Sequence, residues 1–192
     1  MLGVLRRSAD ELGVANVETI EARWEDAVTP PADIVFSAFV LTLVADAPPF
    51  VAKLDALARE RVLLYLGAYS GDAVLDPLWR HFHGAPRAPG PSHLDAVAVL
   101  DELGIHARVK VVEIANHRRF ATVAQAVEYY RDALLLADTA DVRDELERLL
   151  GAWLLGRRGA WRSPLRSVPA AILEWTPAAA QEGRTPTVSE PV

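Results

Sequence analysis

The hydrophobic pattern is most regular in residues 33–66. Residues 33–37 are nearly all apolar without alternation, a pattern typical of a parallel strand covered by helices on both faces. Residues 47–60 have helical spacing, and residues 62–66 form a second apolar run. Strand, helix and strand of these lengths predict a right-handed βαβ unit. The residues that end the first strand, Ser37-Ala38-Phe39, then lie at a carboxyl strand end, where open α/β sheets bind ligands.

The rest of the chain alternates between helical and extended patterns. Helices are predicted where apolar residues recur every three or four positions, many between polar caps and glycines; they cover residues 1–12, 76–82, 92–103, 122–136 and 139–155. Further strands are predicted at residues 17–22, 106–114 and 168–175, the second of them near a sheet edge. We therefore expect one α/β domain over residues 1–175, with a helical insertion at 122–156 and a disordered tail at 176–192.

Composition excludes several classes of protein. The 192 residues include no cysteine, which excludes disulfides and favours a reducing compartment, so a cytoplasmic protein is predicted. The net charge of -6 gives no basic footprint for nucleic acid. The arginines at 157–158 and 162–166 are few and spaced, and a solvated face is the interpretation that we favour. The longest apolar run is too short to span a membrane, so neither nucleic acid nor a membrane is an expected partner.

The order of these pieces resembles the class I S-adenosylmethionine-dependent methyltransferases. The resemblance covers about residues 1–177 and rests on an ordered series of segments: 1–12, 17–20, 24–26, 33–38, 119–126 and the last strand ending in Trp175. Residues 119–126 are similar to a phenylalanine-then-helix segment of many bacterial small-molecule members. The resemblance implies a Rossmann-like, mostly parallel sheet, an antiparallel last strand with a two-helix insertion before it, and S-adenosylmethionine as cofactor.

The sequence also departs from the family. Members carry a first strand that ends in a glycine-rich turn and a second strand that ends in an acidic residue, which together bind the cofactor's amino-acid and ribose parts by the logic of dinucleotide folds. This sequence opens where the helix after the second strand should start, and no such turn occurs later. We therefore expect an N-terminally truncated version of the fold. The absent strand would leave the edge of residues 33–37 exposed and open to self-association.

The resemblance assigns cofactor contacts to two segments. Trp24-Glu25-Asp26 match the loop that borders the adenine, where a carboxylate or a backbone group accepts from the exocyclic amine and an indole stacks. Ser37-Ala38-Phe39 match the strand end beside the sulfonium, where small residues allow close approach and a ring face suits a cation. The alternatives are a surface loop with a half-buried Trp24 and simple core packing of Phe39.

Other polar residues give weaker indications. His81 and His83 alternate, so on a helix they would not share a face, and no carboxylate lies at ligand spacing; no metal site is predicted. Either histidine is a candidate general base, because imidazole titrates near neutrality, although an ordinary surface histidine is the simpler interpretation. Tyr129-Tyr130-Arg131 are candidates to line an acceptor pocket, and ordinary helix packing explains them equally well.

Two functions follow from these observations. The first is transfer of a methyl group from S-adenosylmethionine to a small-molecule acceptor, for which alignment suffices and no catalytic side chain is indicated. The alternative is a non-catalytic methyltransferase-like remnant or interaction module that does not bind the cofactor.

Overall fold

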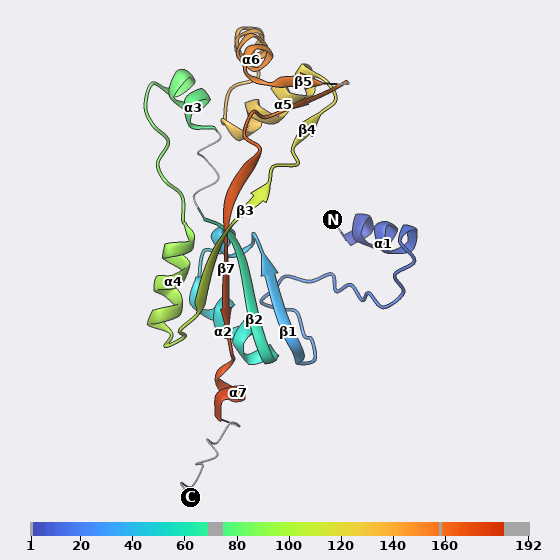
Figure 1. Cartoon of the computed structure of the whole chain (residues 1–192), viewed down its shortest axis with the longest axis vertical. Helices are drawn as coiled ribbons and strands as arrows, with labels where there is room; N and C mark the ends of the chain where they lie inside the picture. Colours follow the sequence, from blue (N-terminus) through green and yellow to red (C-terminus); the bar gives the residue numbers. More distant parts are fainter. Residues whose placement is uncertain (1, 69–74, 158, 183–192) are drawn as a thin grey trace, which may run out of the picture. The chain divides into compact units, whose positions relative to one another are not determined.

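The computed structural model describes residues 2–68, 75–157 and 159–182. Its main sheet has four strands in the order β1-β2-β7-β3. These strands are β1 (Ala32–Ala38), β2 (Ala58–Gly67), β7 (Ser167–Trp175) and β3 (Arg108–Ala115). The last strand in sequence therefore lies in the interior of the sheet, between β2 and β3 (Figure 1).

Strands β1 and β2 run in the same direction. Arg59 forms an ion pair with Asp33 at 3.2 Å near the start of both strands, and the Phe39 N–H donates to the Tyr65 carbonyl at 2.7 Å near their ends. The two pairs have the same sequence separation, as a parallel register requires. This confirms the βαβ unit, whose helix α2 (Ala47–Leu57) buries Phe50, Val51 and Leu54.

Strand β7 runs against its neighbours. It pairs antiparallel with β3, from Arg108 opposite Glu174 to Ala115 opposite Ser167. On its other side the Ala68 N–H, just past the end of β2, donates to Pro169 near the start of β7 at 3.1 Å. The predicted antiparallel last strand is thus confirmed in a sheet whose other three strands share one direction. The strand predicted at 106–114 is also confirmed, at the edge of the sheet.

The expectation that β1 is covered on both faces is wrong. The Ile34 and Phe36 side chains remain 54% and 60% exposed, although Ser37, the next residue along the strand, is buried. Ile34 and Phe36 are two residues apart, so they lie on the same face of β1, which is left open. Strand β1 also has β2 as its one neighbour among the described strands. An apolar run without alternation therefore marks a half-open edge strand here.

Helix α4 (His93–Glu102) follows the proline-rich loop and begins as predicted. The Ser92 side chain accepts from the Leu94 N–H, and the Asp95 carboxylate accepts from the Ser92 N–H at 2.7 Å, which completes a capping box. These hydrogen bonds hold the pKa of Asp95 below its ordinary value. The helix buries Ala96 and Leu100.

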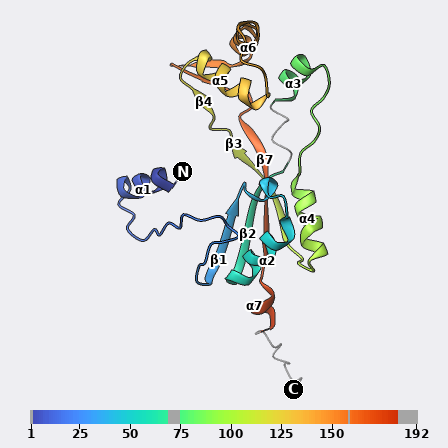
Figure 2. The same ribbon diagram turned by 180° about the vertical axis from the view of Figure 1, so that it is seen from behind.

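The segment between β3 and β7 forms a helical subdomain together with α3 (Asp76–His83), as Figures 1 and 2 show. Helices α5 (Val123–Ala133) and α6 (Ala140–Trp153) form where two helices were predicted; Thr122 caps α5, and Thr139 caps α6. Their core contains fully buried Tyr130, Leu146 and Leu150. It is extended by residues of α3 and of the connecting segments, among them Leu75, Leu78, Phe120, Leu134 and Leu154.

A second sheet in this subdomain was not predicted. It has the order β4-β6-β5, with β4 (Arg119–Phe120), β5 (Leu155–Arg157) and β6 (Ala160–Arg162). Gly156 lies in β5, and Gly159 lies in the turn before β6. A side chain at Gly156 would meet the Trp161 ring at 3.1 Å, so this glycine permits the close approach of an aromatic ring.

The N-terminal region also differs from the prediction. Helix α1 (Leu2–Glu11) forms but has no buried residue, and residues 17–22 are not a strand. Val17 and Ile20 are 42% and 50% exposed. Two apolar residues do not make a segment a strand when no neighbouring strand is there to pair with it. In the predicted tail, residues 178–182 form helix α7 (Ala178–Glu182), whose Ala178 N–H donates to Asp55; residues 183–192 lie outside the described part of the chain.

The chain divides into two compact units, each described by itself. One contains the residues up to 35, residues 45–62 and those from 176 on; the other contains residues 36–44 and 63–175. Trp24, with α2, belongs to the first unit. The strand end at Ser37 and the helical subdomain belong to the second.

Candidate functional site

The carboxyl end of β1 has an unusual backbone. Ser37 is buried, Ala38 is half-buried, and Phe39 adopts a φ of 55°. A positive φ is uncommon for a residue with a bulky side chain and is held only by surrounding contacts. Here the contacts are the Phe39 N–H bond to the Tyr65 carbonyl and an edge-on contact between the two rings at 4.8 Å. The 48% exposure of Phe39 excludes the alternative that it is simply core.

The turn after Phe39 is fixed by a short 3-10 helix. This helix (Leu41–Leu43) buries Leu41, while Leu43 at its end is 83% exposed. The buried Leu41 side chain anchors the turn. The Phe39 ring remains accessible near Ser37, which is small and buried. Close approach of a ligand to a strand end and contact of a cation with a ring face both require such a surface.

The Trp24 loop is organised around Lys53 of α2. The Lys53 ammonium donates to the carbonyls of Trp24, Glu25 and Ala27, the last at 2.8 Å. It also lies 4.9 Å from the centroid of the Trp24 ring, which contacts the Phe50 ring at 5.5 Å. One cation thus satisfies three carbonyls of the turn and interacts with the indole.

This arrangement restricts what the loop can offer a ligand. Lys53 and Phe50 already contact the Trp24 ring, so adenine stacking there requires the ammonium to move. The Trp24 Nε1–H is buried and has no hydrogen-bond partner within the described residues, so a ligand could reach it only after the loop rearranges. Glu25 is exposed and paired with Arg23 at 3.5 Å, and Asp26 is also exposed. The two exposed carboxylates are the acceptors of this loop, and the Glu25 carboxylate is already paired with Arg23.

The two histidines proposed as candidate bases have structural partners in the helical subdomain. His81 Nε2 lies 2.8 Å from the Glu145 carboxylate, and His83 Nε2 donates to the Leu134 carbonyl at 2.9 Å. The His83 ring also stacks on Trp79 at 4.0 Å. The Arg148 guanidinium, and to a smaller extent His81, lowers the pKa of Glu145 to about 2. These contacts tie α3 to α6 and to the end of α5, so the simpler interpretation of both histidines is the better one.

Tyr130 and Arg131 are also explained by packing. Tyr130 is fully buried against Phe120 and Trp153, and burial raises its pKa to about 12. Arg131 pairs with Asp132 at 2.9 Å and with Asp138 at 3.5 Å. Arg143 of α6 pairs with Asp138 and with Glu128 of α5, so these charges join the two helices. No acceptor pocket at these residues is needed to account for them.

Replacement of Tyr130 by phenylalanine is expected to stabilise the protein. The Tyr130 hydroxyl is buried without a hydrogen-bond partner among the described residues, and removing such a group avoids a desolvation penalty of about 1 kcal/mol. The wild-type free energy of unfolding should also fall above pH 10, because the unfolded state releases the phenolic proton before the folded state does. Urea denaturation of Tyr130→Phe between neutral pH and pH 11 measures both effects.

The matched control is Tyr129→Phe, because Tyr129 is 37% exposed. It should change neither the stability at neutral pH nor its decline above pH 10. A loss of more than about 1 kcal/mol in Tyr130→Phe would show that the hydroxyl has a partner, and would contradict the description of this core.

Neither a metal-ligand cluster nor a membrane-spanning helix occurs in the described residues. No three His, Asp or Glu side chains there come together as metal ligands. Within the same ranges, every helix is too short or too polar to cross a membrane.

The fold of this chain is similar to that of a proposed methyltransferase from Bacillus halodurans, with a TM-score of 0.52 and 14% identity. The alignment covers 91% of this chain and 78% of that protein. At this identity the likeness shows the fold alone. No family model matches the sequence, and no curated protein matches it.

Two other solved structures align more loosely. One is a proposed sarcosine dimethylglycine methyltransferase from Galdieria sulphuraria, with a TM-score of 0.43 and 11% identity over 90% of this chain and 64% of that one. The other is the plantazolicin methyltransferase BamL in complex with a substrate analogue and SAH, with a TM-score of 0.40 and 13% identity over 88% of this chain and 63% of that one. This chain spans less than two thirds of the length of either protein, and these two alignments carry no argument about its fold.

Proposed function

We propose that this protein takes part in S-adenosylmethionine-dependent methyl transfer to a small-molecule acceptor. The single observation that carries the proposal is the antiparallel last strand, β7, in a sheet whose other strands are parallel; the sequence resemblance implies such a last strand. The fold shared with the Bacillus halodurans protein supports the same class.

The end of β1 fits the reactive part of such a cofactor in three respects. Ser37 is small and buried, Ala38 is small, and the Phe39 ring is exposed where a sulfonium could lie against it. The bound cofactor would supply an activated methyl group. The role proposed for Ser37, Ala38 and Phe39 is to align donor and acceptor for in-line attack, because positioning alone provides much of the acceleration of a bimolecular step.

The adenine side fits less well. We propose that Asp26 accepts a hydrogen bond from the adenine and that Trp24 and Glu25 border it. The contacts of Lys53 and Phe50 with the Trp24 ring disfavour stacking without rearrangement. This observation favours the second candidate function, a methyltransferase-like module that does not bind the cofactor. The sequence also has no glycine-rich turn of the family type to bind the amino-acid end.

The experiment is a titration of the 15N-labelled 192-residue chain with S-adenosylmethionine, followed by amide chemical shifts. Because the ribose and carboxylate contacts of the family are missing from this sequence, we expect weak binding, with a dissociation constant above about 100 µM, or less than about 5.5 kcal/mol of binding free energy. The shifts should concentrate at residues 37–40 and 24–27. Ser37→Val should abolish the first group of shifts by filling the space beside the strand end.

The control is Ser167→Val, at the exposed start of β7 and outside both segments, which should leave the shifts unchanged. Shifts spread evenly over the surface, or absent at millimolar cofactor, would exclude the proposed site and leave the non-binding module. A micromolar dissociation constant would contradict the expected weakness and show that the described contacts suffice.

Two further proposals concern the setting of the protein. The absence of cysteine supports a cytoplasmic protein. The exposed edge of β1 supports self-association with a second copy of the chain, because a seven-residue strand with one neighbour offers an unpaired row of backbone donors and acceptors.

A further inference from the structure

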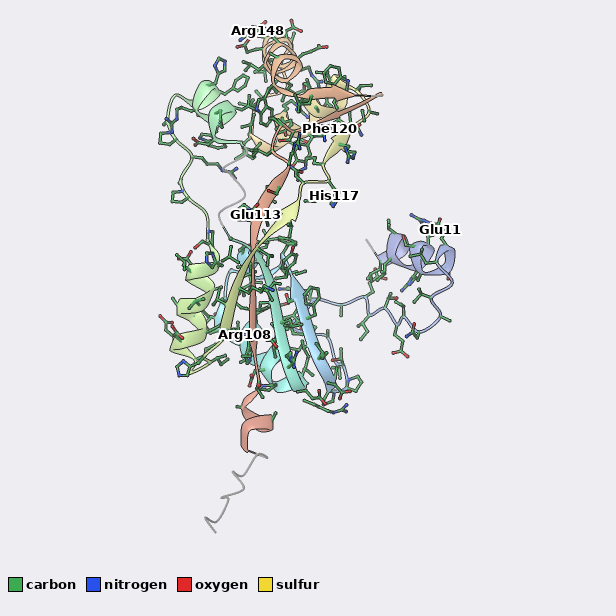
Figure 3. All side chains as sticks on the ribbon, in the orientation of Figure 1. Glu11, Arg108, Glu113, His117, Phe120 and Arg148 are labelled. Carbon is green, nitrogen blue, oxygen red and sulfur yellow. The ribbon has the colours of Figure 1, made fainter. Side chains whose placement is uncertain are left out.

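A pocket of about 340 Å³ lies where the chain passes between the main sheet and the second sheet of the helical subdomain. Its lining includes three arginines, Arg119, Arg162 and Arg166, together with His117, Asn116 and Ser163. Figure 3 shows His117 between β3 and β4, just past the carboxyl end of β3. No acidic residue lines this pocket.

The arginines of the pocket are drawn together by strand pairing. Arg119 of β4 and Arg162 of β6 are direct partners in the antiparallel register. Side chains directly opposite in such a pair are about 4.5–5.5 Å apart at Cβ, and like charges there are destabilising. Arg166 joins them because the Asn116 N–H donates to its carbonyl at 2.8 Å.

None of the three guanidinium groups has an acidic partner among the described residues. Several other arginines of the same unit have a carboxylate or an aromatic ring as partner. Arg80, Arg108 and Arg148 each pair with a carboxylate, and Arg118 lies over the Tyr129 ring at 4.3 Å. The chain carries a net charge of -6, so an excess of basic residues does not explain a cluster without counter-charges.

Two neutral hydrogen-bonding groups of the pocket are fixed by the backbone. The Asn116 Oδ1 accepts from the Arg118 N–H at 3.1 Å, which leaves its amide N–H groups to donate elsewhere. The buried Ser163 Oγ accepts from the Leu165 N–H at 3.2 Å, which leaves its hydroxyl proton to donate. The pocket thus combines three positive charges with donors that have a set orientation.

We infer that this pocket is a binding site for a small oxyanion, either a phosphate or the carboxylate group of a larger small molecule. Planar guanidinium groups form paired hydrogen bonds with both kinds of anion, and an anion between Arg119 and Arg162 would cancel the repulsion of the cross-strand pair. The inference rests on the pocket alone and holds whether or not the protein transfers methyl groups.

The experiment is isothermal titration calorimetry of the full chain with inorganic phosphate and, separately, with citrate, each against sodium chloride of matched ionic strength. We expect saturable binding of at least one probe with one site per chain. Tighter binding of phosphate identifies a phosphate site, and tighter binding of citrate a carboxylate site. Arg162→Gln and Arg119→Gln should each weaken binding by about 10- to 100-fold, as expected for loss of a hydrogen bond to a charged group.

Arg118→Gln is the matched control, because Arg118 is adjacent in sequence and does not line the pocket. It should bind the probe within about twofold of the wild type, a difference too small to reflect a lost charged hydrogen bond. Without anion, Arg162→Gln should melt at the same or a higher temperature than the wild type, because it removes the like-charge pair; a folding defect would lower the melting temperature instead.

Three results would overturn the inference. The first is no saturable heat with either probe beyond the sodium chloride control. The second is equal weakening by Arg118→Gln and Arg162→Gln, which would indicate diffuse charge rather than a site. The third is binding of a single-stranded oligonucleotide far tighter than binding of phosphate or citrate, which would indicate a nucleic-acid surface.

Discussion

Replacement of Leu173 by alanine is expected to lower the free energy of unfolding by about 3 kcal/mol. Leu173 is fully buried on β7, opposite Val109 of β3, and the substitution leaves a cavity in the interior of the sheet. A loss of this size is a large part of the 5–15 kcal/mol that stabilises a typical domain. Urea denaturation followed by far-UV circular dichroism measures it.

Ile172→Ala is the control for this prediction. Ile172 is adjacent on β7 and only partly buried, so its loss should be clearly smaller, near 1 kcal/mol. If the two variants lose the same stability, or Leu173→Ala loses less than about 1 kcal/mol, then β7 does not have a buried face and the described strand order is wrong.

Replacement of Phe36 by lysine is expected to prevent the proposed self-association through the β1 edge. Phe36 is 60% exposed on β1, at the end of the strand order. A second copy that pairs along β1 would place its own side chains beside Phe36 on this apolar face, and a charge placed on an edge strand opposes such pairing. Sedimentation velocity at increasing concentration should show association for the wild type and a constant monomer for Phe36→Lys.

Leu43→Lys provides the matched control, because it adds the same charge at an exposed apolar residue outside β1. It should associate as the wild type does. A wild-type chain that stays monomeric at every concentration would exclude the proposed association, and loss of association in both variants would place the contact outside the β1 edge.

The elements that the sequence predicted well are those fixed by local chemistry. Thr122, Thr139 and Ser92 begin their helices because each side chain satisfies a free backbone N–H of the first turn. The βαβ unit was predictable because an apolar strand, a helix with a buried stripe and a second strand follow each other closely. The resemblance to a family added the antiparallel direction of the last strand.

The missed elements depend on distant partners. The three strands of the second sheet have only two or three residues each, too few for a periodic pattern, and β4 is a strand because it pairs with β6, more than forty residues later. The opposite error occurred at residues 17–22, where two apolar residues suggested a strand that has no partner. The exposure of Phe36 was missed because apolar runs indicate burial only when something covers them.

The candidate sites show the same division. The segment at Ser37 was predictable from its place at the end of a strand. The positive φ of Phe39 and the hydrogen bonds from Lys53 to the Trp24 loop depend on tertiary contacts, which the sequence pattern does not indicate. Arg162 and Arg166 were interpreted as a solvated face because they are few and spaced along the chain. Arg119 lies more than forty residues before them in the sequence. Only the cross-strand register, which places Arg119 opposite Arg162, shows that these arginines form a cluster.

The position of β7 determines when the sheet can form. Strands β2 and β3 do not pair with each other, and β7, which follows both in sequence, lies between them. During synthesis, β1, α2 and β2 can assemble early, whereas β3 has no strand partner until residues 167–175 are available. Such long-range pairing slows folding and leaves strand edges open in the intermediate. A chain cut before residue 167 should therefore lose both β7 and the attachment of β3 to the rest of the sheet.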